Sequence, residues 1–562
     1  MHSSRRGAAV VVVLSAVGLA ACAPTAPPSV VPGSSVVVGW SAELTSLNAA
    51  AHPTAGNLDI AAATRSRFGD TVDGDFIPDE SFGTASIAGD DPFTVRYDLA
   101  EPSWSDGIPV DAADLMLGWA GAAGAFAADG GSSQDEAPAP PVVDEFARAI
   151  EVTFPAPTIS WQTAVSAPVP AHVVGERAFG LDDPMEAKQA VLRALAERDA
   201  AATAAIAEEW DRAFEIAADG DTAPEVLISS GPYLLDGIDG SGGDQTVRLV
   251  PNPGYRGAAT PRIARVDLVP RGKDPAAAVG DSLDLVTLAP TADNRGPIRE
   301  KERRDFAVQA THDGTVWSVL LRPDRIFSDR AARAAFLRVV PADEMVAAGA
   351  GEWARVYAKS TSMVAAPGSR AFDIVNEDSG FTDALGTPAD DPPLDRSRAG
   401  VPARTRVCVL YDRGSAFAAG AFTALQKAAK EAGWAVADCG SDDVSKALSG
   451  GGWNAVIDRV RIPQTPDEMA AQWGSEGAAS VTGHADADRD DLIATLAETV
   501  DVYAARELTA RIERTIVDAA VARPIAVNPR VTIVDPGLSS VTVRNGSRAP
   551  VMSGIAQWAP AG

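Results

Sequence analysis

The side chains that most often carry chemistry are scarce in this 562-residue chain, which has three cysteines and five histidines. Three cysteines cannot form a four-cysteine zinc site, and five scattered histidines leave little material for a site with several histidine ligands. The sequence also lacks the short motifs of a phosphate-binding loop, a dinucleotide-binding turn, a zinc-protease helix and a serine-hydrolase elbow. These absences argue against an enzyme and predict neither a metal nor a cofactor.

Carboxylates are the one abundant class of reactive side chain, with 76 aspartates and glutamates. Residues 486–491 (DADRDD) look like the start of a calcium loop, but Asp491 stands where such a loop needs glycine. A charged turn that caps a following helix explains this run better. Two carboxylates could form the acid pair of a glycoside hydrolase, although nothing in the sequence selects a pair.

Cys22 is the cysteine whose surroundings predict a modification. A basic start at residues 5–6 precedes an apolar run over residues 8–21, which is shorter than the about 20 residues that a helix needs to cross a bilayer. This pattern indicates a secretory signal peptide over residues 1–21. The LAAC sequence at residues 19–22 resembles the bacterial lipobox, in which the cysteine receives lipid and becomes the N-terminus. The alternative is an ordinary signal peptide followed by a chance cysteine.

The residues after the predicted cleavage point indicate where the folded body lies. Residues 22–35 are rich in proline, serine and threonine, as in a flexible tether. Because two acyl chains anchor a protein stably, we predict an extracytoplasmic body that Cys22 ties to membrane lipid at the outer face of the cytoplasmic membrane. Cys408 and Cys439 would then lie in an oxidising space and form either a disulfide or two buried free thiols.

The charge balance excludes one class of partner. The net charge is −28, and affinity for nucleic acid requires clustered lysine and arginine, so we expect no nucleic-acid partner. Hydrophobic residues make up 46% and charged residues 22% of the chain, which is typical of a folded protein. The acid excess predicts a body that an anionic membrane surface repels. We expect a monomer.

Strand and helix patterns alternate along the whole chain, which predicts an α/β fold. Among the predicted elements are a strand at 35–40, a helix at 112–121, a helix at 185–218 broken near 199–203, strands at 406–411 and 454–458, and a helix at 503–521. Residues 386–404 are dense in proline, aspartate and arginine and predict an exposed linker.

Four separated groups of residues together resemble one family. They are residues 104–110 (WSDGIPV), residues 230–233 (SGPY) with 249–255 (LVPNPGY), residues 328–336 (SDRAARAAF) and residues 472–493. In this order and spacing they resemble the extracytoplasmic solute-binding proteins of ABC importers, family 5, the dipeptide/oligopeptide-binding class. Each motif alone is weak, but the ordered set covers nearly all of the mature chain. The motif residues form turns, caps and packing anchors, so the signature indicates a fold rather than a ligand.

The resemblance implies a bilobed, type II periplasmic-binding-protein fold. Lobe I would comprise residues 36–309 and 524–562, with an inserted subdomain at about residues 63–222, and lobe II would comprise residues 310–523. Ligands usually bind in the cleft between such lobes, which close by a hinge. The closed form would then be recognised by the permease subunits in the membrane.

The resemblance also implies candidate ligand-binding residues. In relatives, the loop after the first strand and the crossover strand near residues 311–317 face the cleft, which selects Ser46, Asn48 and Trp317. Trp317 would either stack on a ligand or belong to the core.

The chain departs from the peptide-binding pattern in lobe II. Peptide-binding relatives hold the α-ammonium of the ligand with an acid shortly after a lobe II strand. Here the nearest acid, Asp458, comes about five positions early, and Arg459 and Arg461 follow in the predicted loop. The two arginines would bind a carboxylate or another anion bidentately; the alternative is that they are solvated or paired with the acidic surface.

The function that the resemblance implies is a lipid-anchored receptor of an ABC importer. It would capture peptides or similar small organic solutes and deliver them to the permease, without catalysing a reaction. Two alternatives stay open, namely an extracellular hydrolase and a lipoprotein of the same fold that senses, scaffolds or binds a non-peptide solute.

Overall fold

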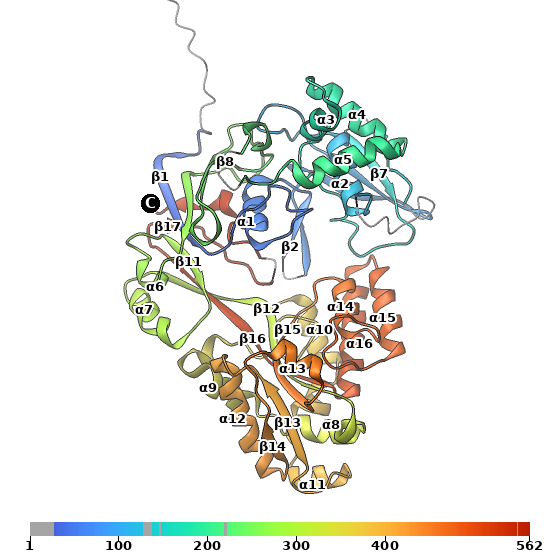
Figure 1. The fold of residues 1–562 in the computed structure, drawn as a ribbon, viewed down its shortest axis with the longest axis vertical. Helices are drawn as coiled ribbons and strands as arrows, with labels where there is room; N and C mark the ends of the chain where they lie inside the picture. Colours follow the sequence, from blue (N-terminus) through green and yellow to red (C-terminus); the bar gives the residue numbers. More distant parts are fainter. Residues whose placement is uncertain (1–26, 73, 127–137, 145–147, 218–221, 548) are drawn as a thin grey trace, which may run out of the picture.

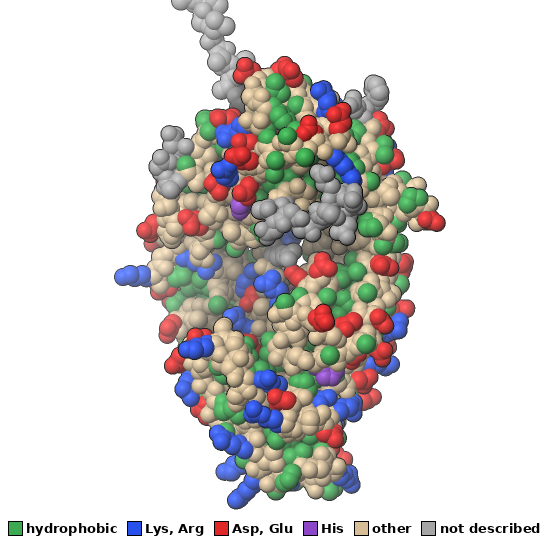
Figure 2. Space-filling model, turned by 45° about the vertical axis from the view of Figure 1, so that its right-hand side comes forward, with side chains coloured by type: hydrophobic (Ala, Val, Ile, Leu, Met, Phe, Trp, Pro, Cys, Tyr) green, Lys and Arg blue, Asp and Glu red, His purple; other side chains and the backbone are tan. Residues whose placement is uncertain are grey.

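The computed structural model describes residues 27–72, 74–126, 138–144, 148–217, 222–547 and 549–562. These residues form two lobes joined by two long strands (Figure 1). Figure 2 shows the surface hollowed at the level where the lobes meet. The predicted bilobed α/β architecture is therefore confirmed. The predicted signal peptide at residues 1–21 and Cys22 lie outside the described residues.

One ten-stranded sheet runs through both lobes in the order β14-β13-β15-β12-β16-β11-β1-β10-β9-β8. Lobe I contains one end of this sheet, where β1 is parallel to β10 and β11, and lobe II the other, where β13 is parallel to β14 and β15. The lobe I strands are β1 (Val31–Trp40), β8 (Tyr233–Asp239), β9 (Thr246–Pro251), β10 (Ile263–Pro270) and β11 (Leu285–Leu288). The lobe II strands are β13 (Arg406–Tyr411), β14 (Ala435–Asp438) and β15 (Ala455–Arg461).

Two antiparallel strands, β12 (Ala307–Leu321) and β16 (Ala522–Val534), cross from one lobe to the other. Their register shifts between His312 and Val316, where Gly314 has a φ of +78° that glycine tolerates without strain. On one side of this shift β16 pairs with β11 of lobe I, and on the other side β12 pairs with β15 of lobe II. The predicted boundaries after residues 309 and 523 fall within these two strands, and the residue limits of the lobes stay a prediction.

A subdomain is inserted in lobe I, as predicted. Its four-stranded antiparallel sheet has the order β4-β5-β7-β6 and lies beside a group of helices (Figure 1). Its elements are β4 (Gly83–Asp90), β5 (Phe93–Leu99), β6 (Val142–Asp144), β7 (Ala149–Thr153), α2 (Ala112–Ala122), α3 (Ala171–Phe179), α4 (Pro184–Ala196) and α5 (Ala200–Arg212). The predicted break in the helix at 185–218 is the one between α4 and α5, where the Asp199 side chain caps α5.

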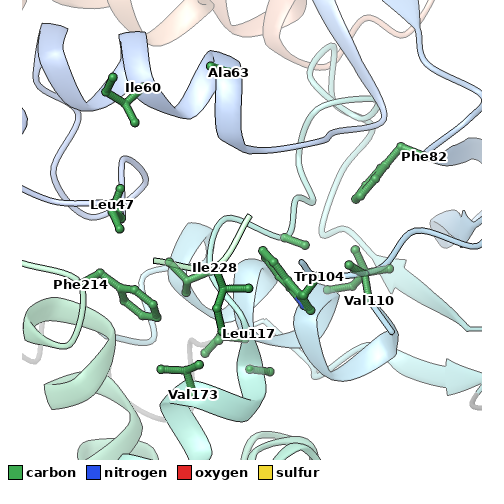
Figure 3. Packing of buried hydrophobic residues seen from close by; sticks show 14 of the residues in the cluster. Leu47, Ile60, Ala63, Phe82, Trp104, Val110, Leu117, Val173, Phe214 and Ile228 are labelled. Carbon is green, nitrogen blue, oxygen red and sulfur yellow. The ribbon is translucent and has the colours of Figure 1, made fainter. Parts of the chain in front are cut away.

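The tryptophan motif at residues 104–110 is part of the packing of lobe I. Trp104 is completely buried, and its indole nitrogen donates to Asp114 Oδ1 at 3.2 Å. The other carboxylate oxygen of Asp114 accepts from Lys188 Nζ at 2.7 Å. Figure 3 shows Trp104 among the apolar side chains of this core, beside Val110 and Leu117. The motif therefore fixes helix α2 and the chain before it.

Lobe II surrounds its strands with helices (Figure 1). These are α8 (Arg330–Leu337), α9 (Ala342–Ala350), α10 (Arg370–Asp378), α11 (Pro392–Arg398), α12 (Ala416–Glu431), α13 (Val444–Gly450), α14 (Pro466–Trp473), α15 (Ala487–Ala497) and α16 (Val502–Ala519). The helix predicted at 503–521 is α16. Further short elements are α6 (Pro275–Ala278), α7 (Ala292–Glu302), β17 (Leu538–Ser539) and β18 (Ala559–Pro560).

The predicted exposed linker at residues 386–404 is exposed over most of its length, but it is not an unstructured linker. Residues 392–398 form α11, because Asp391 caps the helix and the prolines that follow occupy its first turn, where no backbone donor is needed. Arg396 is only 7% exposed and donates to the carbonyl of Ala432 at 3.2 Å. Arg338, which follows α8, holds Asp395 with a contact of 2.8 Å. The segment is therefore packed onto lobe II.

Candidate ligand-binding cleft

A cavity of about 360 Å³ lies on the lobe I side of the hollow between the lobes. Its wall comes from α1 (Ala55–Thr64), the hairpin strand β2 (Gly69–Val72), residues 166–168 and the C-terminal loop at residues 544–554. Gln464, which follows β15 in lobe II, also lines it. The volume is within the range of small-molecule pockets, so the cavity is the candidate ligand site.

Three arginines and one aspartate line this cavity among the described residues. Arg67 Nη1 lies 2.8 Å from Asp70 Oδ1, and Arg544 Nη1 lies 2.6 Å from Asp70 Oδ2. Asp70 thus bridges the segment after α1 to the C-terminal loop. Because two guanidinium groups share one carboxylate, this cluster carries a net positive charge.

Arg65 adds a second positive charge to the wall. It is 8% exposed and donates to the carbonyls of Pro168 at 2.6 Å, Ile228 at 2.9 Å and Thr64 at 3.0 Å. Burial lowers the pKa of Arg65 to about 10, because a buried cation loses its hydration. The side chain is therefore still protonated at neutral pH. It links the end of α1 to the neighbouring loops, and the backbone carbonyls that accept its hydrogen bonds stabilise its positive charge in the cavity wall.

The C-terminal loop that carries Arg544 is fixed to the crossing strands. Arg530 on β16 donates to the carbonyls of His312 at 3.2 Å, Arg544 at 3.4 Å and Gly546 at 2.8 Å. The Oδ1 of Asn545 accepts from the backbone N–H of His312 at 3.1 Å. These bonds join the cavity wall to β12 next to its register shift, so the position of Arg544 depends on the strands that connect the lobes.

Ser46 and Asn48 are buried in the loop that follows β1. Ser46 is 1% exposed and its hydroxyl accepts from the backbone N–H of Asn48, while Asn48 is 0% exposed and donates to the carbonyl of Trp210 at 2.8 Å. The side chain of Asn57 accepts from the backbone N–H of Ser46 at 3.1 Å. The structure therefore uses both polar side chains to hold the loop, whose Leu47 lines the cavity.

Trp317 belongs to an aromatic stack in the core of lobe II. Its ring stacks on Phe417 with the centroids 4.4 Å apart, and Phe417 stacks on Tyr357 at 5.0 Å. Trp317 is 6% exposed, and its indole nitrogen donates to Asn528 Oδ1 at 2.9 Å. The guanidinium of Arg459 lies 5.6 Å from the Trp317 ring centroid, a cation–π distance. Of the two alternatives for Trp317, the structure adopts the core position.

Arg459 and Arg461 lie in a strand, and the prediction that they occupy a loop is wrong. Strand β15 continues to Arg461 instead of ending at Asp458, because it keeps pairing with β12 up to that residue. Both arginine side chains are exposed. Arg459 Nη1 lies 3.5 Å from Asp313 Oδ2, next to the register shift in β12. The ligand-binding role of the two arginines stays a prediction.

The five predicted residues all lie within the described part of the chain, and none of them lines the 360 Å³ cavity. Sequence reasoning missed Arg65, Arg67 and Arg544. A signal existed for the first two, which stand close together after a helix in an acidic chain. For Arg544 no local signal existed, because its partner Asp70 is 474 residues away in the sequence.

Three further observations bear on the predicted chemistry. Cys408 on β13 and Cys439, which directly follows the neighbouring strand β14, form a disulfide with their Cα atoms 5.6 Å apart. Within the described residues, no group of three or more histidine, cysteine or acidic side chains is arranged to hold a metal ion. No helix in the described ranges has the length and apolar character to cross a membrane.

Comparison with proteins of known structure shows the same fold. A periplasmic EDTA-binding protein, EppA, superposes with a TM-score of 0.73 at 17% identity, over 94% of this chain and 97% of that chain. The oligopeptide-binding protein AppA of Bacillus subtilis, solved with a nonapeptide, gives a TM-score of 0.59 at 11% identity, over 94% and 99% of the two chains. The fold is therefore that of the bilobed periplasmic binding proteins.

Sequence comparison gives the family. An uncharacterized lipoprotein of Mycobacterium leprae (strain TN) is 25% identical over 291 residues, which is 50% of this chain and 48% of the relative. The chain thus spans about half the length of the curated relative that it matches. Residues 88–384 match the bacterial extracellular solute-binding proteins, family 5 (middle). Because this match covers more than half of the chain, the protein belongs to family 5 of the bacterial extracellular solute-binding proteins.

Proposed function

We propose that this protein is the lipid-anchored receptor of an ABC importer, which captures a small organic solute between its lobes and delivers it to permease subunits. The observation that carries the proposal is the 360 Å³ cavity beside two strands that connect the lobes. A ligand that contacts both walls stabilises the closed arrangement by its differential affinity. The receptor needs no catalytic group for this cycle.

The volume of the cavity limits the size of the solute. Structural neighbours are named for binding EDTA and a nonapeptide, so the fold alone does not select a ligand. A volume of about 360 Å³ is at the lower end of the about 300–1,000 Å³ typical of small-molecule pockets. We therefore favour a solute of dipeptide size or smaller over a long peptide.

Anchoring through Cys22 is the second part of the proposal. It is supported by the signal-like N-terminus and by the relative that is named a lipoprotein. Lipid at Cys22 would keep the lobes near the permease. The tether predicted at residues 22–35 extends too far, because residues 31–35 already belong to β1, which pairs with β10.

The test combines binding with a measurement of shape. We expect one class in a panel of dipeptides, oligopeptides, sugars and small organic acids to raise Tm and to reduce the radius of gyration in small-angle X-ray scattering. Binding of any class without a change in shape would contradict capture by closure. Turnover of a peptide or ester, with no shift in Tm, would favour a hydrolase instead.

A further inference from the structure

The charge of the cavity wall opposes the charge of the whole protein. The chain has a net charge of −28, yet the described residues that line the cavity include three arginines, one aspartate and no lysine, glutamate or histidine. A random sample of this acidic surface would contain more carboxylates than cations. The wall is thus a local positive site in a protein that otherwise repels anions.

The contacts of the arginines leave this charge available to a ligand. Within the described residues, the ion-pair partner of both Arg67 and Arg544 is Asp70, whose two oxygens they approach to 2.8 Å and 2.6 Å. A guanidinium has five N–H donors in a planar fork, so each arginine keeps donors for a second acceptor. The side chains of Arg67 and Arg544 are 42% and 27% exposed, which lets a solute in the cavity reach them.

Arg65 makes the electrostatic potential in the cavity more positive, but its nitrogens already donate to the protein backbone. Its nitrogens donate to backbone carbonyls, and it forms no ion pair with the acids of the described residues. A buried cation without an anionic partner is costly in free energy. An anion that enters the cavity would offset part of this cost.

A cationic solute fits this wall poorly. An ammonium group needs a carboxylate, and Asp70, the one acid among the described residues of the wall, already forms ion pairs with two arginines. An additional cation would add repulsion from Arg65 at short range. The geometry points to the opposite chemistry.

We propose that the cavity binds solutes that carry a carboxylate or another oxyanion, and that Arg67 and Arg544 hold this group by charge-assisted hydrogen bonds. The inference rests on the proposed function, since it names the solute class for the same cleft. The serine hydroxyls and amides of the wall, including Ser66 and Gln464, would then contact the uncharged part of the solute.

The test uses the purified full chain and matched acid and amide pairs on several small skeletons, such as glutarate with glutaramide and N-acetyldialanine with its amide. Methyl phosphate distinguishes a phosphate ligand from a carboxylate. We expect at least one acid to bind in isothermal titration calorimetry and its amide not to bind. Loss of one hydrogen-bonded arginine in Arg67→Gln or Arg544→Gln should weaken acid binding by about tenfold to a hundredfold.

Two further variants show whether a loss of binding comes from lost ligand contacts or from a folding defect. Arg398→Gln changes an exposed arginine on α11, at the far end of lobe II (Figure 1), and should leave binding unchanged. Arg544→Lys keeps the charge but loses the fork, so its affinity should lie between those of the wild type and Arg544→Gln. Thermal unfolding without ligand should be similar in these variants.

Three results would overturn the anion inference. They are amides that bind as tightly as their acids, acids that bind Arg544→Gln and the wild type equally, and a panel in which no acid binds. An uncharged or cationic solute that contracts the lobes in small-angle scattering would overturn this inference and leave solute capture intact. Failure of every solute class to contract the lobes would contradict the proposed function itself.

Discussion

Asp75 of lobe I and Arg506 of lobe II form an ion pair that bridges the two lobes. Asp75 opens the hairpin strand β3 (Asp75–Pro78), and Arg506 lies on α16 with its side chain 11% exposed. The Nε of Arg370 on α10 lies 3.2 Å from the other oxygen of Asp75. A second bridge is the backbone N–H of Ile159, which donates to the carbonyl of Ala497 at 2.9 Å. These contacts stabilise the arrangement in which the lobes touch.

Removing the Asp75 carboxylate should therefore shift the protein toward separated lobes. Asp75→Asn breaks a partly buried pair, and we expect a loss of about 1–2 kcal/mol, or a shift of about five- to thirtyfold in the open–closed equilibrium. The radius of gyration from small-angle scattering should rise. Arg212→Gln, which breaks an exposed pair with Glu208 on α5, is the matched control. An unchanged radius in Asp75→Asn would show that the bridge does not hold the lobes together.

Glu513 should make the stability of lobe II depend on pH. Its carboxylate is 1% exposed and accepts from the Ser362 hydroxyl at 2.7 Å and from the backbone N–H groups of Met363 at 2.9 Å and Val364 at 3.1 Å. Burial nevertheless raises the pKa of Glu513 to about 7, since the hydrogen bonds and Arg489 offset only part of the desolvation cost. The unfolded chain has the ordinary pKa near 4.5.

The sign of this effect follows from linkage. The folded state binds the Glu513 proton more tightly, so the contribution to stability is full below about pH 4.5 and is lost as pH rises through 7. A shift of this size corresponds to about 3 kcal/mol. Glu513→Gln should remove this pH dependence, although its lower acceptor capacity should also destabilise lobe II. Denaturant unfolding of both proteins from pH 4.5 to 8 is the measurement, with exposed Glu431→Gln as control. Parallel profiles for Glu513→Gln and the wild type would contradict the assignment.

Lys188 should be essential for the stability of lobe I. It is 1% exposed and contacts Asp111 at 3.0 Å and Asp114 at 2.7 Å. Lys188→Met would leave the buried carboxylate of Asp114 and the half-buried carboxylate of Asp111 without their cation, and breaking a buried ion pair costs about 3–5 kcal/mol. Urea unfolding should show this loss, while Lys427→Met on the exposed face of α12 should show little change. Similar stability in both variants would mean that the two acids find other partners or protonate.

The sequence alone predicted the packing motif around Trp104 but not the cavity lined by arginines. The fold was predictable because motifs such as the one at Trp104 act locally, through a cap and a contact ten residues away at Asp114. Strand ends were less predictable, since β15 continues to Arg461 only because β12 lies beside it. The cavity was the least predictable feature. Its arginines at 67 and 544 meet through Asp70, and no periodic pattern reports a contact over such a separation.

The ligand-binding role of Ser46 and Asn48 stays a prediction, and the contacts of these residues show a related limit of sequence reasoning. Ser46 and Asn48 have side chains that suit ligand binding, but the Ser46 hydroxyl accepts from the backbone N–H of Asn48, and the Asn48 amide donates to the carbonyl of Trp210. The sequence shows which residues can donate and accept, whereas the fold decides whether those groups are already used. Arg67 and Arg544 differ because a guanidinium has more donors than Asp70 can engage.

The last prediction concerns Cys22, which lies outside the described residues. If Cys22 carries lipid, Cys22→Ser should move the protein from the membrane fraction into the medium, because no acyl chain then holds it. Immunoblots of the membrane, soluble and medium fractions measure this directly. Cys408→Ser is the control, because it removes a cysteine of the Cys408–Cys439 disulfide and leaves the N-terminus intact. That variant should stay on the membrane with reduced stability, by about 2–4 kcal/mol for a lost disulfide. Membrane retention of Cys22→Ser would show that something other than this cysteine anchors the receptor.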